Sequence, residues 1–142
     1  MCSLDVKDFF LSGTPLEVAA DVSKLFGPPL AEPIHNVAYT LMDSQFVLAS
    51  ITKQLFKCFC GTGMGLLHSG FLANLAYYSR VEAKFLHRTQ QLGILYYYRF
   101  FDGIIIIFDS RESMPAFLPD HLRSGTAYFK VLCGEVSSQS MK

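Results

Sequence analysis

The segment from Ile94 to Phe108 constrains the fold of this chain more than any other part of the sequence. Two runs rich in Ile, Tyr and Phe, at 94–101 and 104–108, favour strands, and Asp102-Gly103 lies between them. Asp-Gly between such runs predicts a β-hairpin, because a type I′ turn needs positive φ at both central residues. The hairpin would hold the Asp102 carboxylate at its tip, in water, on a rigid support. Such a carboxylate suits a metal ion, although an ordinary hairpin turn has the same pattern.

Composition places the chain among folded domains. Its 142 residues correspond to one domain or part of one, and 51% hydrophobic against 17% charged residues exclude a disordered chain. The formal net charge is zero, so the sequence lacks the basic surface of a free-standing nucleic-acid binder. The most apolar window, 94–108, is interrupted by Arg99 and Asp102 and is shorter than the ~20 residues that span a bilayer. We therefore expect no membrane partner.

The four cysteines, Cys2, Cys58, Cys60 and Cys133, do not form a metal-binding pattern. A Cys-x-Cys pair near His68 is a weak zinc signal without a second pair, and the alternation in F-K-C-F-C favours a short strand. Reduced cysteines and an N-terminus without a signal sequence predict an intracellular protein, cytoplasmic or nuclear.

The rest of the chain predicts helices and strands without a regular βαβ repeat. Further strands are expected at 2–6, 55–60 and 127–133. Helices are expected at 16–26, capped by Thr14, at 43–52, and at 70–87, capped by Ser69. Pro33 predicts a loop over 30–39, and we expect a loop with a short helix at 111–123. This mixture predicts a single α+β domain, in which a mostly antiparallel sheet carries helices packed on one face and a central β-hairpin.

Three segments carry chemistry-bearing residues in a fixed order. The first is Leu4-Asp5-Val6-Lys7-Asp8-Phe9-Phe10, the second is the loop Gly61-Thr-Gly-Met-Gly65 with S-G-F-L-A-N-L at 69–75, and the third is Arg99-Phe-Phe-Asp102. In this order they resemble motifs A, B and C of the palm of reverse transcriptases, closest to retron, group II intron and other non-retroviral retroelement lineages. The second segment is the most specific, because G-x-x-M-G followed by S-x-x-L-A-N-L at this offset is hard to obtain by chance.

The resemblance implies an RNA-directed DNA polymerase, which transfers nucleotides with two Mg²⁺ ions ~3.5–4 Å apart. Asp5 and Asp102 would be the catalytic carboxylates and, with the backbone carbonyl of Val6, the metal ligands, since Mg²⁺ prefers carboxylate oxygens, water and phosphates. The implied partners are an RNA template, a DNA primer and a deoxynucleoside triphosphate.

The resemblance also implies a substrate-binding surface. Phe10 would lie under the sugar of the incoming nucleotide and exclude a 2′ hydroxyl. Gly61, Gly63 and Gly65 would let the backbone approach the template–nucleotide pair closely, as glycine permits. Each residue also has a plain structural interpretation: Phe10 as part of the core, the glycines as a turn, and Asp5 as a helix cap.

The chain departs from the family pattern at several positions. Gly103 stands where the family has a second aspartate, so the site would hold two formal negative charges instead of three. Gly63 replaces a proline, and Leu66-Leu67 replaces Ser-Pro. We expect residues 1–142 to be a partial palm domain without fingers and thumb, inactive as an isolated chain.

Two other functions fit the sequence. One is a non-enzymatic interaction domain that reuses a palm scaffold, since a fold does not fix a function. The other is a different palm-type nucleotidyl enzyme, such as a nucleotide cyclase, in which a hairpin also presents acidic residues. Asp102-Gly-Ile lacks the glutamate that would follow in a cyclase, and the glycine-rich segment has no counterpart there.

Overall fold

The computed structural model describes residues 1–10, 12–114 and 130–136, the last of these as backbone only. The chain forms two compact units, one of Met1–Phe9 with Arg80–Lys142 and one of Phe10–Ser79, and each is described by itself. Both combine helical turns or helices with antiparallel strands, so the α+β class is confirmed. None of the helices in the described residues is long and apolar enough to cross a membrane.

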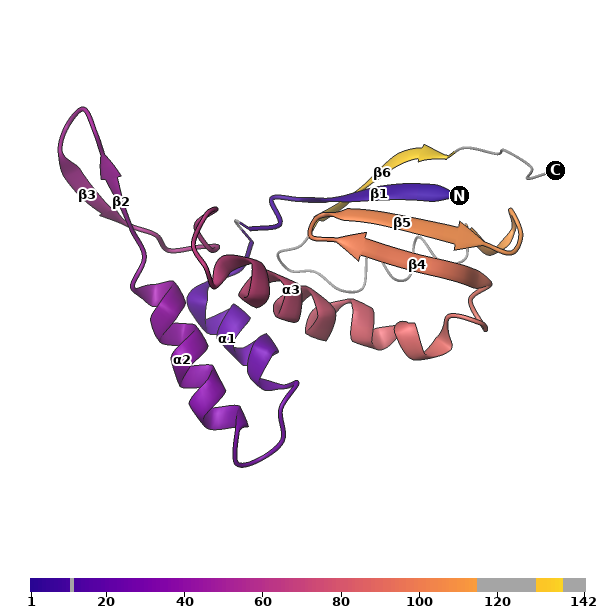
Figure 1. Cartoon of the computed structure of the whole chain (residues 1–142), viewed down its shortest axis with the longest axis horizontal. Helices are drawn as coiled ribbons and strands as arrows, with labels where there is room; N and C mark the ends of the chain where they lie inside the picture. Colours follow the sequence, from indigo (N-terminus) through magenta and orange to yellow (C-terminus); the bar gives the residue numbers. More distant parts are fainter. Residues whose placement is uncertain (11, 115–129, 137–142) are drawn as a thin grey trace. The chain divides into compact units, whose positions relative to one another are not determined.

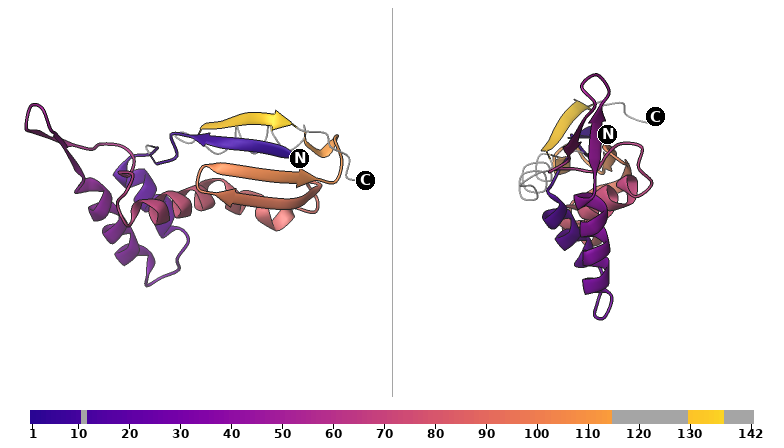
Figure 2. Two further views of the ribbon diagram at one scale, coloured as in Figure 1. Left: turned by 45° about the horizontal axis from the view of Figure 1, so that its top comes forward. Right: turned by 90° about the vertical axis from the view of Figure 1, so that its left-hand side faces the viewer.

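The first unit contains a four-stranded antiparallel sheet with the strand order β4-β5-β1-β6. Its strands, seen side by side in Figures 1 and 2, are β1 (Cys2–Lys7), β4 (Ile94–Phe100), β5 (Gly103–Phe108) and β6 (Lys130–Val136). The first strand and both hairpin strands occur where the sequence predicts them. The last strand begins at Lys130, and residues 127–129 of its predicted range lie outside the described residues.

Side chains alternate between the two faces along each strand, and one face of this sheet is buried. On β1, Cys2, Leu4 and Val6 are buried, and the register pairs Leu4 with Ile104 and Cys2 with Ile106, which are also buried. Each large apolar side chain buried in this way contributes about 1.5–3 kcal/mol. The intervening residues, Asp5 among them, lie on the opposite, exposed face.

Two 3-10 turns, η1 (Glu82–Lys84) and η2 (Leu86–Arg88), precede β4. The predicted helix at 70–87 is therefore wrong at its C-terminal end, because α3 (Ser69–Arg80) ends at Arg80. Val81, Glu82 and Phe85 are all buried in this short stretch. Tertiary packing of these side chains overrides the helical pattern of the sequence.

The second unit begins with α1 (Pro15–Ser23), close to the predicted helix. Thr14 forms a capping box with Glu17: the Thr14 hydroxyl accepts from the Glu17 backbone N–H at 3.3 Å, and the Glu17 carboxylate accepts from the Thr14 backbone N–H at 2.9 Å. Pro15 fits the first position because its missing N–H would have no helical partner. The cap predicted at Thr14 is confirmed.

The predicted loop over 30–39 is wrong, since α2 spans Ala31–Asp43. Pro33 lies in the first turn, where backbone N–H groups have no partner inside the helix, so it does not interrupt the ladder. In Figures 1 and 2, α1 and α2 lie side by side. Val18 and Val22 on α1, and Ala38 and Met42 on α2, are buried.

The helix predicted at 43–52 is also wrong, because α2 ends there and a hairpin follows. The strand β2 (Phe46–Ala49) pairs antiparallel with β3 (Gln54–Lys57), which covers part of the strand predicted at 55–60. Aromatic and β-branched residues at the start of β2 favour the strand. The hairpin extends away from the end of α2 (Figures 1 and 2), and Ala49 is its only strand residue that is not exposed.

Candidate functional site

The turn between β4 and β5 differs from the predicted one. Phe100 pairs with Gly103, so the two central residues are Phe101 and Asp102, not Asp102 and Gly103. Phe101 adopts the left-handed φ of 51°, whereas the φ of Gly103 lies outside that region. The strands β4 and β5 therefore form a hairpin at the predicted residues, but it lies at one edge of the sheet and not at its centre, and the type I′ turn centred on Asp-Gly is wrong. Asp102 is exposed at the tip.

The register of the sheet brings Asp5 close to this turn. Asp5 pairs with Gly103, and the Val6 backbone N–H donates to the Asp102 carbonyl oxygen at 2.9 Å. Because this hydrogen bond flanks the Asp5–Gly103 pair, the pair is of the non-hydrogen-bonded kind, with Cα atoms typically ~4.5 Å apart. Asp5 on β1 thus lies beside the turn residue Asp102, and both predicted carboxylate residues are exposed.

The backbone of Val6 is directed toward the same turn. In an antiparallel ladder the N–H and C=O of one residue point to the same neighbouring strand. Since the Val6 N–H binds the Asp102 carbonyl, the Val6 carbonyl also faces the hairpin. Carboxylate and carbonyl oxygens are the hard donors that Mg²⁺ prefers.

Asp5, Asp102 and the Val6 carbonyl are residues of the kind that would hold one Mg²⁺ with several waters, because Mg²⁺ commonly binds through one or two carboxylates plus phosphates. No group of three or more His, Cys, Asp or Glu side chains suited to a metal ion occurs in the described part of the chain. The set is therefore one carboxylate short of the two-ion arrangement that the resemblance implies.

Gly103 has space for a side chain such as the second carboxylate that the resemblance implies at this position. A Cβ added there would lie 3.6 Å from the Phe100 carbonyl oxygen, an ordinary van der Waals distance. Its φ is also compatible with a side chain. A side chain at position 103 would lie on the same face as Asp5, since cross-strand partners share a face.

Sequence reasoning missed a buried ion pair behind the turn. The guanidinium of Arg99 binds the Glu82 carboxylate through Nε at 2.7 Å and Nη2 at 3.0 Å, and the Tyr97 hydroxyl donates to the same carboxylate at 2.7 Å. The Arg99 and Glu82 side chains are only 11% and 6% exposed. Arg99 is therefore part of a buried ion pair and not a solvated surface residue. The pairing spans 17 residues, so no local periodicity could have indicated it.

In the second unit, the glycine-rich loop contacts the segment that follows β1. Gly61 N–H donates to the Gly13 carbonyl at 2.7 Å, and Thr62 N–H donates to the Phe10 carbonyl at 2.5 Å. The structure thus joins Phe10 to the loop through the backbone, while the Phe10 side chain is half-buried. The roles of Phe10 and the glycines toward a nucleotide stay predictions.

Two of the three predicted glycines are required by backbone conformation. Gly61 and Gly65 have φ of 72° and 92°, which other residues rarely adopt. Gly63 has no such φ, and a Cβ there would lie 3.1 Å from Leu66 Cδ1, a tight contact with a flexible side chain. Ser69 does not cap the helix as predicted: it is the first residue of α3, and its hydroxyl donates to the Gly63 carbonyl.

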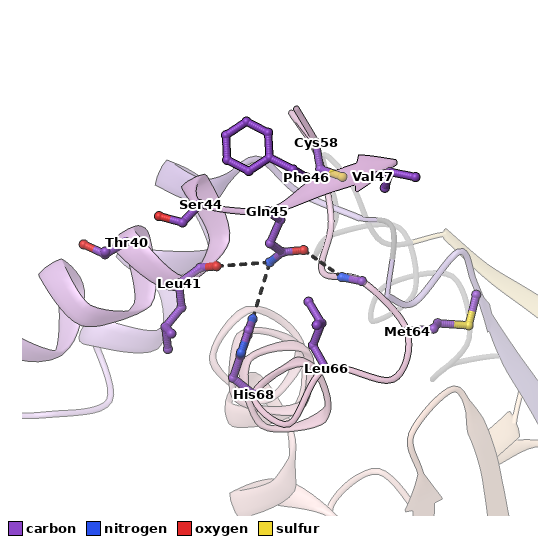
Figure 3. Close-up of a pocket in the computed structure, with 11 residues that line it drawn as sticks. Thr40, Leu41, Ser44, Gln45, Phe46, Val47, Cys58, Met64, Leu66 and His68 are labelled. Atoms are coloured by element: carbon purple, nitrogen blue, oxygen red, sulfur yellow. Dashed lines mark hydrogen bonds between the residues drawn. The ribbon is translucent and has the colours of Figure 1, made fainter. Parts of the chain in front are cut away.

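Gln45 also fixes this loop, although no motif in the sequence indicates it. Its Oε1 accepts from Gly63 N–H at 2.8 Å, its Nε2 donates to the Leu41 carbonyl at 3.3 Å, and Nε2 lies 3.5 Å from His68 Nε2 (Figure 3). Gln45 lies in the wall of a pocket of about 550 Å³. The other residues that line it are Thr40, Leu41, Ser44, Phe46, Val47, Cys58, Gly63, Met64, Leu66 and His68.

Comparisons of the chain with protein-family models, with curated proteins and with solved structures found no match.

Proposed function

We propose that this chain is a piece of a reverse transcriptase palm, from a non-retroviral retroelement, whose metal site has lost one carboxylate. The observation that carries the proposal is the pairing of β1 with the β4–β5 hairpin. It sets Asp5 opposite Gly103 and next to Asp102, with the backbone of Val6 facing the same turn. Asp5 and Asp102 lie in the two sequence segments that resemble motifs A and C, and the glycine loop that resembles motif B is built on Gly61 and Gly65.

The proposed roles follow the resemblance. Asp5 and Asp102, with the Val6 carbonyl, would hold Mg²⁺, which when bound supplies charge stabilisation to a primer hydroxyl and a nucleoside triphosphate. Phe10 would contact the nucleotide sugar, and the loop at 61–65 would lie against the template–nucleotide pair. The partners would be an RNA template, a DNA primer and a deoxynucleoside triphosphate, inside the cell.

We further propose that this chain does not polymerise by itself. Because position 103 is a glycine, only two carboxylates would offset the charge of the metal ions. The family uses three carboxylates for this purpose. The zero net charge also gives little attraction to nucleic-acid phosphates, which supply most of the affinity of proteins that bind nucleic acids. The proposed function is thus a palm scaffold with a weakened cation site.

Cation binding tests this proposal directly. Mn²⁺, a paramagnetic substitute for Mg²⁺, is titrated into the protein, and free Mn²⁺ is measured by electron paramagnetic resonance. We expect weak binding to the parent chain, loss of binding in Asp102→Asn, and binding at least tenfold tighter in Gly103→Asp. Gly27→Asp is the matched control for added charge, since no atom of the described residues lies within 4 Å of a Cβ at Gly27. Equal affinities of Gly103→Asp and Gly27→Asp would refute the proposed site.

A second candidate function is a non-enzymatic interaction domain built on the same scaffold. The β2–β3 hairpin favours it, because Phe46, Leu48, Leu55 and Phe56 are each more than half exposed. Exposed apolar side chains that gather on one surface often mark interaction sites. Loss of cation binding with retained partner binding would favour this candidate over the polymerase palm.

A further inference from the structure

The buried carboxylate of Glu82 holds the guanidinium of Arg99 in one orientation. Glu82 is 4% exposed, and its two oxygens accept two hydrogen bonds from Arg99 and one from the Tyr97 hydroxyl. A two-point contact between guanidinium and carboxylate fixes the plane of the guanidinium as well as its position. A buried charge is costly unless it is paired, so Glu82 and Arg99 are held together in this one arrangement.

The remaining side of the guanidinium faces the turn that carries Asp102. Arg99 Nη1 donates to the Phe101 carbonyl oxygen at 2.9 Å, and the guanidinium carbon lies 5.7 Å from the ring centre of Phe9, near the end of β1. Arg99 therefore contacts the hairpin turn and Phe9, in the turn that follows β1.

Asp102 consequently lies between two anchored peptide groups. Arg99 binds the carbonyl of the preceding residue, Phe101, and the Val6 N–H binds the carbonyl of Asp102 itself. Phe101 also has the left-handed φ of 51°, a conformation that is unfavourable for an aromatic residue and persists only where its surroundings enforce it. The hydrogen bond from Arg99 to the Phe101 carbonyl helps to hold Phe101 in this conformation.

We propose that Arg99, held by Glu82, is a positioning residue that fixes the Phe101–Asp102 turn and thereby directs the Asp102 carboxylate toward a divalent cation shared with Asp5. The cation part of this inference rests on the proposed function, whereas the fixing of the turn does not. The alternative is an ion pair that stabilises the whole unit without any special effect on the turn.

The test variant is the double substitution Glu82→Gln/Arg99→Met. Removing both partners leaves no unpaired buried charge, so the fold is expected to survive, while the contact with the Phe101 carbonyl is lost. Tyr97→Phe is the matched control, because it removes a hydrogen bond from the same carboxylate and leaves Arg99 on the turn. Two quantities are measured: Mn²⁺ affinity, and hydrogen exchange of the Val6 amide relative to that of Ile106, farther along the sheet.

We expect the double variant to bind Mn²⁺ about tenfold more weakly, the usual size of an outer-shell effect at a metal site. Its Val6 amide should exchange faster relative to Ile106, and Tyr97→Phe should change neither quantity. Equal acceleration of Val6 and Ile106, or a Tyr97→Phe effect as large as that of the double variant, would show general stabilisation and overturn the inference. If no protein, the parent included, binds Mn²⁺, the proposed function fails, and the relative exchange of Val6 still decides whether Arg99 fixes the turn.

Discussion

Asp5 on β1 and Gly103 on β5 face each other as a cross-strand pair on the side of the sheet away from its core. This pair links the predicted metal ligand Asp5 to the position where the proposed family membership implies a second carboxylate. Within the part of the chain that the structure describes, a Cβ at Gly103 meets only the Phe100 carbonyl at 3.6 Å, so we expect the consequences of placing a carboxylate there to be set by charge and not by packing.

Restoring the carboxylate should make stability dependent on Mg²⁺. Like charges directly opposite each other on a sheet repel, so Gly103→Asp should lower the free energy of unfolding by about 0.2–1 kcal/mol without divalent cations. Millimolar Mg²⁺ should reverse this loss, because a ligand that binds only the folded state stabilises it. Urea unfolding of the parent, Gly103→Asp and Gly27→Asp, each with Mg²⁺ and with EDTA, measures the effect. A loss that Mg²⁺ leaves unchanged would argue against the cation site.

Polymerase activity should be absent from the chain and from its repaired variant. We expect no primer extension on an RNA template with Mg²⁺ by the parent, and none by Gly103→Asp. Positioning of template, primer and triphosphate is a separate requirement, worth about 7–11 kcal/mol of barrier. Labelled primer extension with both proteins, and with Asp102→Asn as control, measures this. Extension by the parent that disappears in Asp102→Asn would show that the remaining carboxylates suffice for catalysis.

The sequence predicted the elements that local chemistry determines. Thr14, Pro15 and Glu17 specify the start of α1 by satisfying its first backbone N–H groups, and the capping box is present. The alternating strand of Asp5 and the apolar runs around Asp102 specify the sheet, because a period of two identifies a half-buried strand. The pairing of β1 with β5 then explains why Asp5 lies close to Asp102.

What the sequence did not predict depends on contacts distant in the chain. The loop predicted from Pro33 is wrong, because proline interrupts a helix in its interior and not in its first turn, where Pro33 lies. The turn is centred one residue earlier than Asp-Gly suggested, where Arg99 binds the Phe101 carbonyl. The buried Glu82 and Gln45 side chains find partners 17 and 18 residues away, which no local pattern reveals.

Gln45 should be important for the stability of the unit that contains the glycine loop. Gln45→Met removes the acceptor for Gly63 N–H and the donor to the Leu41 carbonyl, while the volume of the side chain is nearly conserved. A buried polar group left without a partner costs about 1–3 kcal/mol. We expect a loss of that size in urea unfolding, with Gln91→Met, at an exposed position, as the control. Equal stabilities of the two variants would show that water replaces both hydrogen bonds.

The β2–β3 hairpin should make the chain self-associate. An isolated two-stranded hairpin is marginally stable in water, and unpaired strand edges with apolar side chains promote association. Leu48 and Leu55 are cross-strand partners and are 57% and 64% exposed. The double variant Leu48→Lys/Leu55→Glu replaces them with an ion pair that keeps the register while removing apolar surface. We therefore expect the parent to form oligomers or aggregates and the variant to shift strongly toward monomer.

Size-exclusion chromatography with light scattering measures this shift. The matched control is Leu16→Glu/Leu30→Lys, which changes the same residue types at positions that are 60% and 56% exposed but lie outside the hairpin. Because the control removes a similar amount of apolar surface, a difference between the two variants assigns the association to the hairpin. A monodisperse parent, or an equal response of both variants, would show that the exposed hairpin does not drive association.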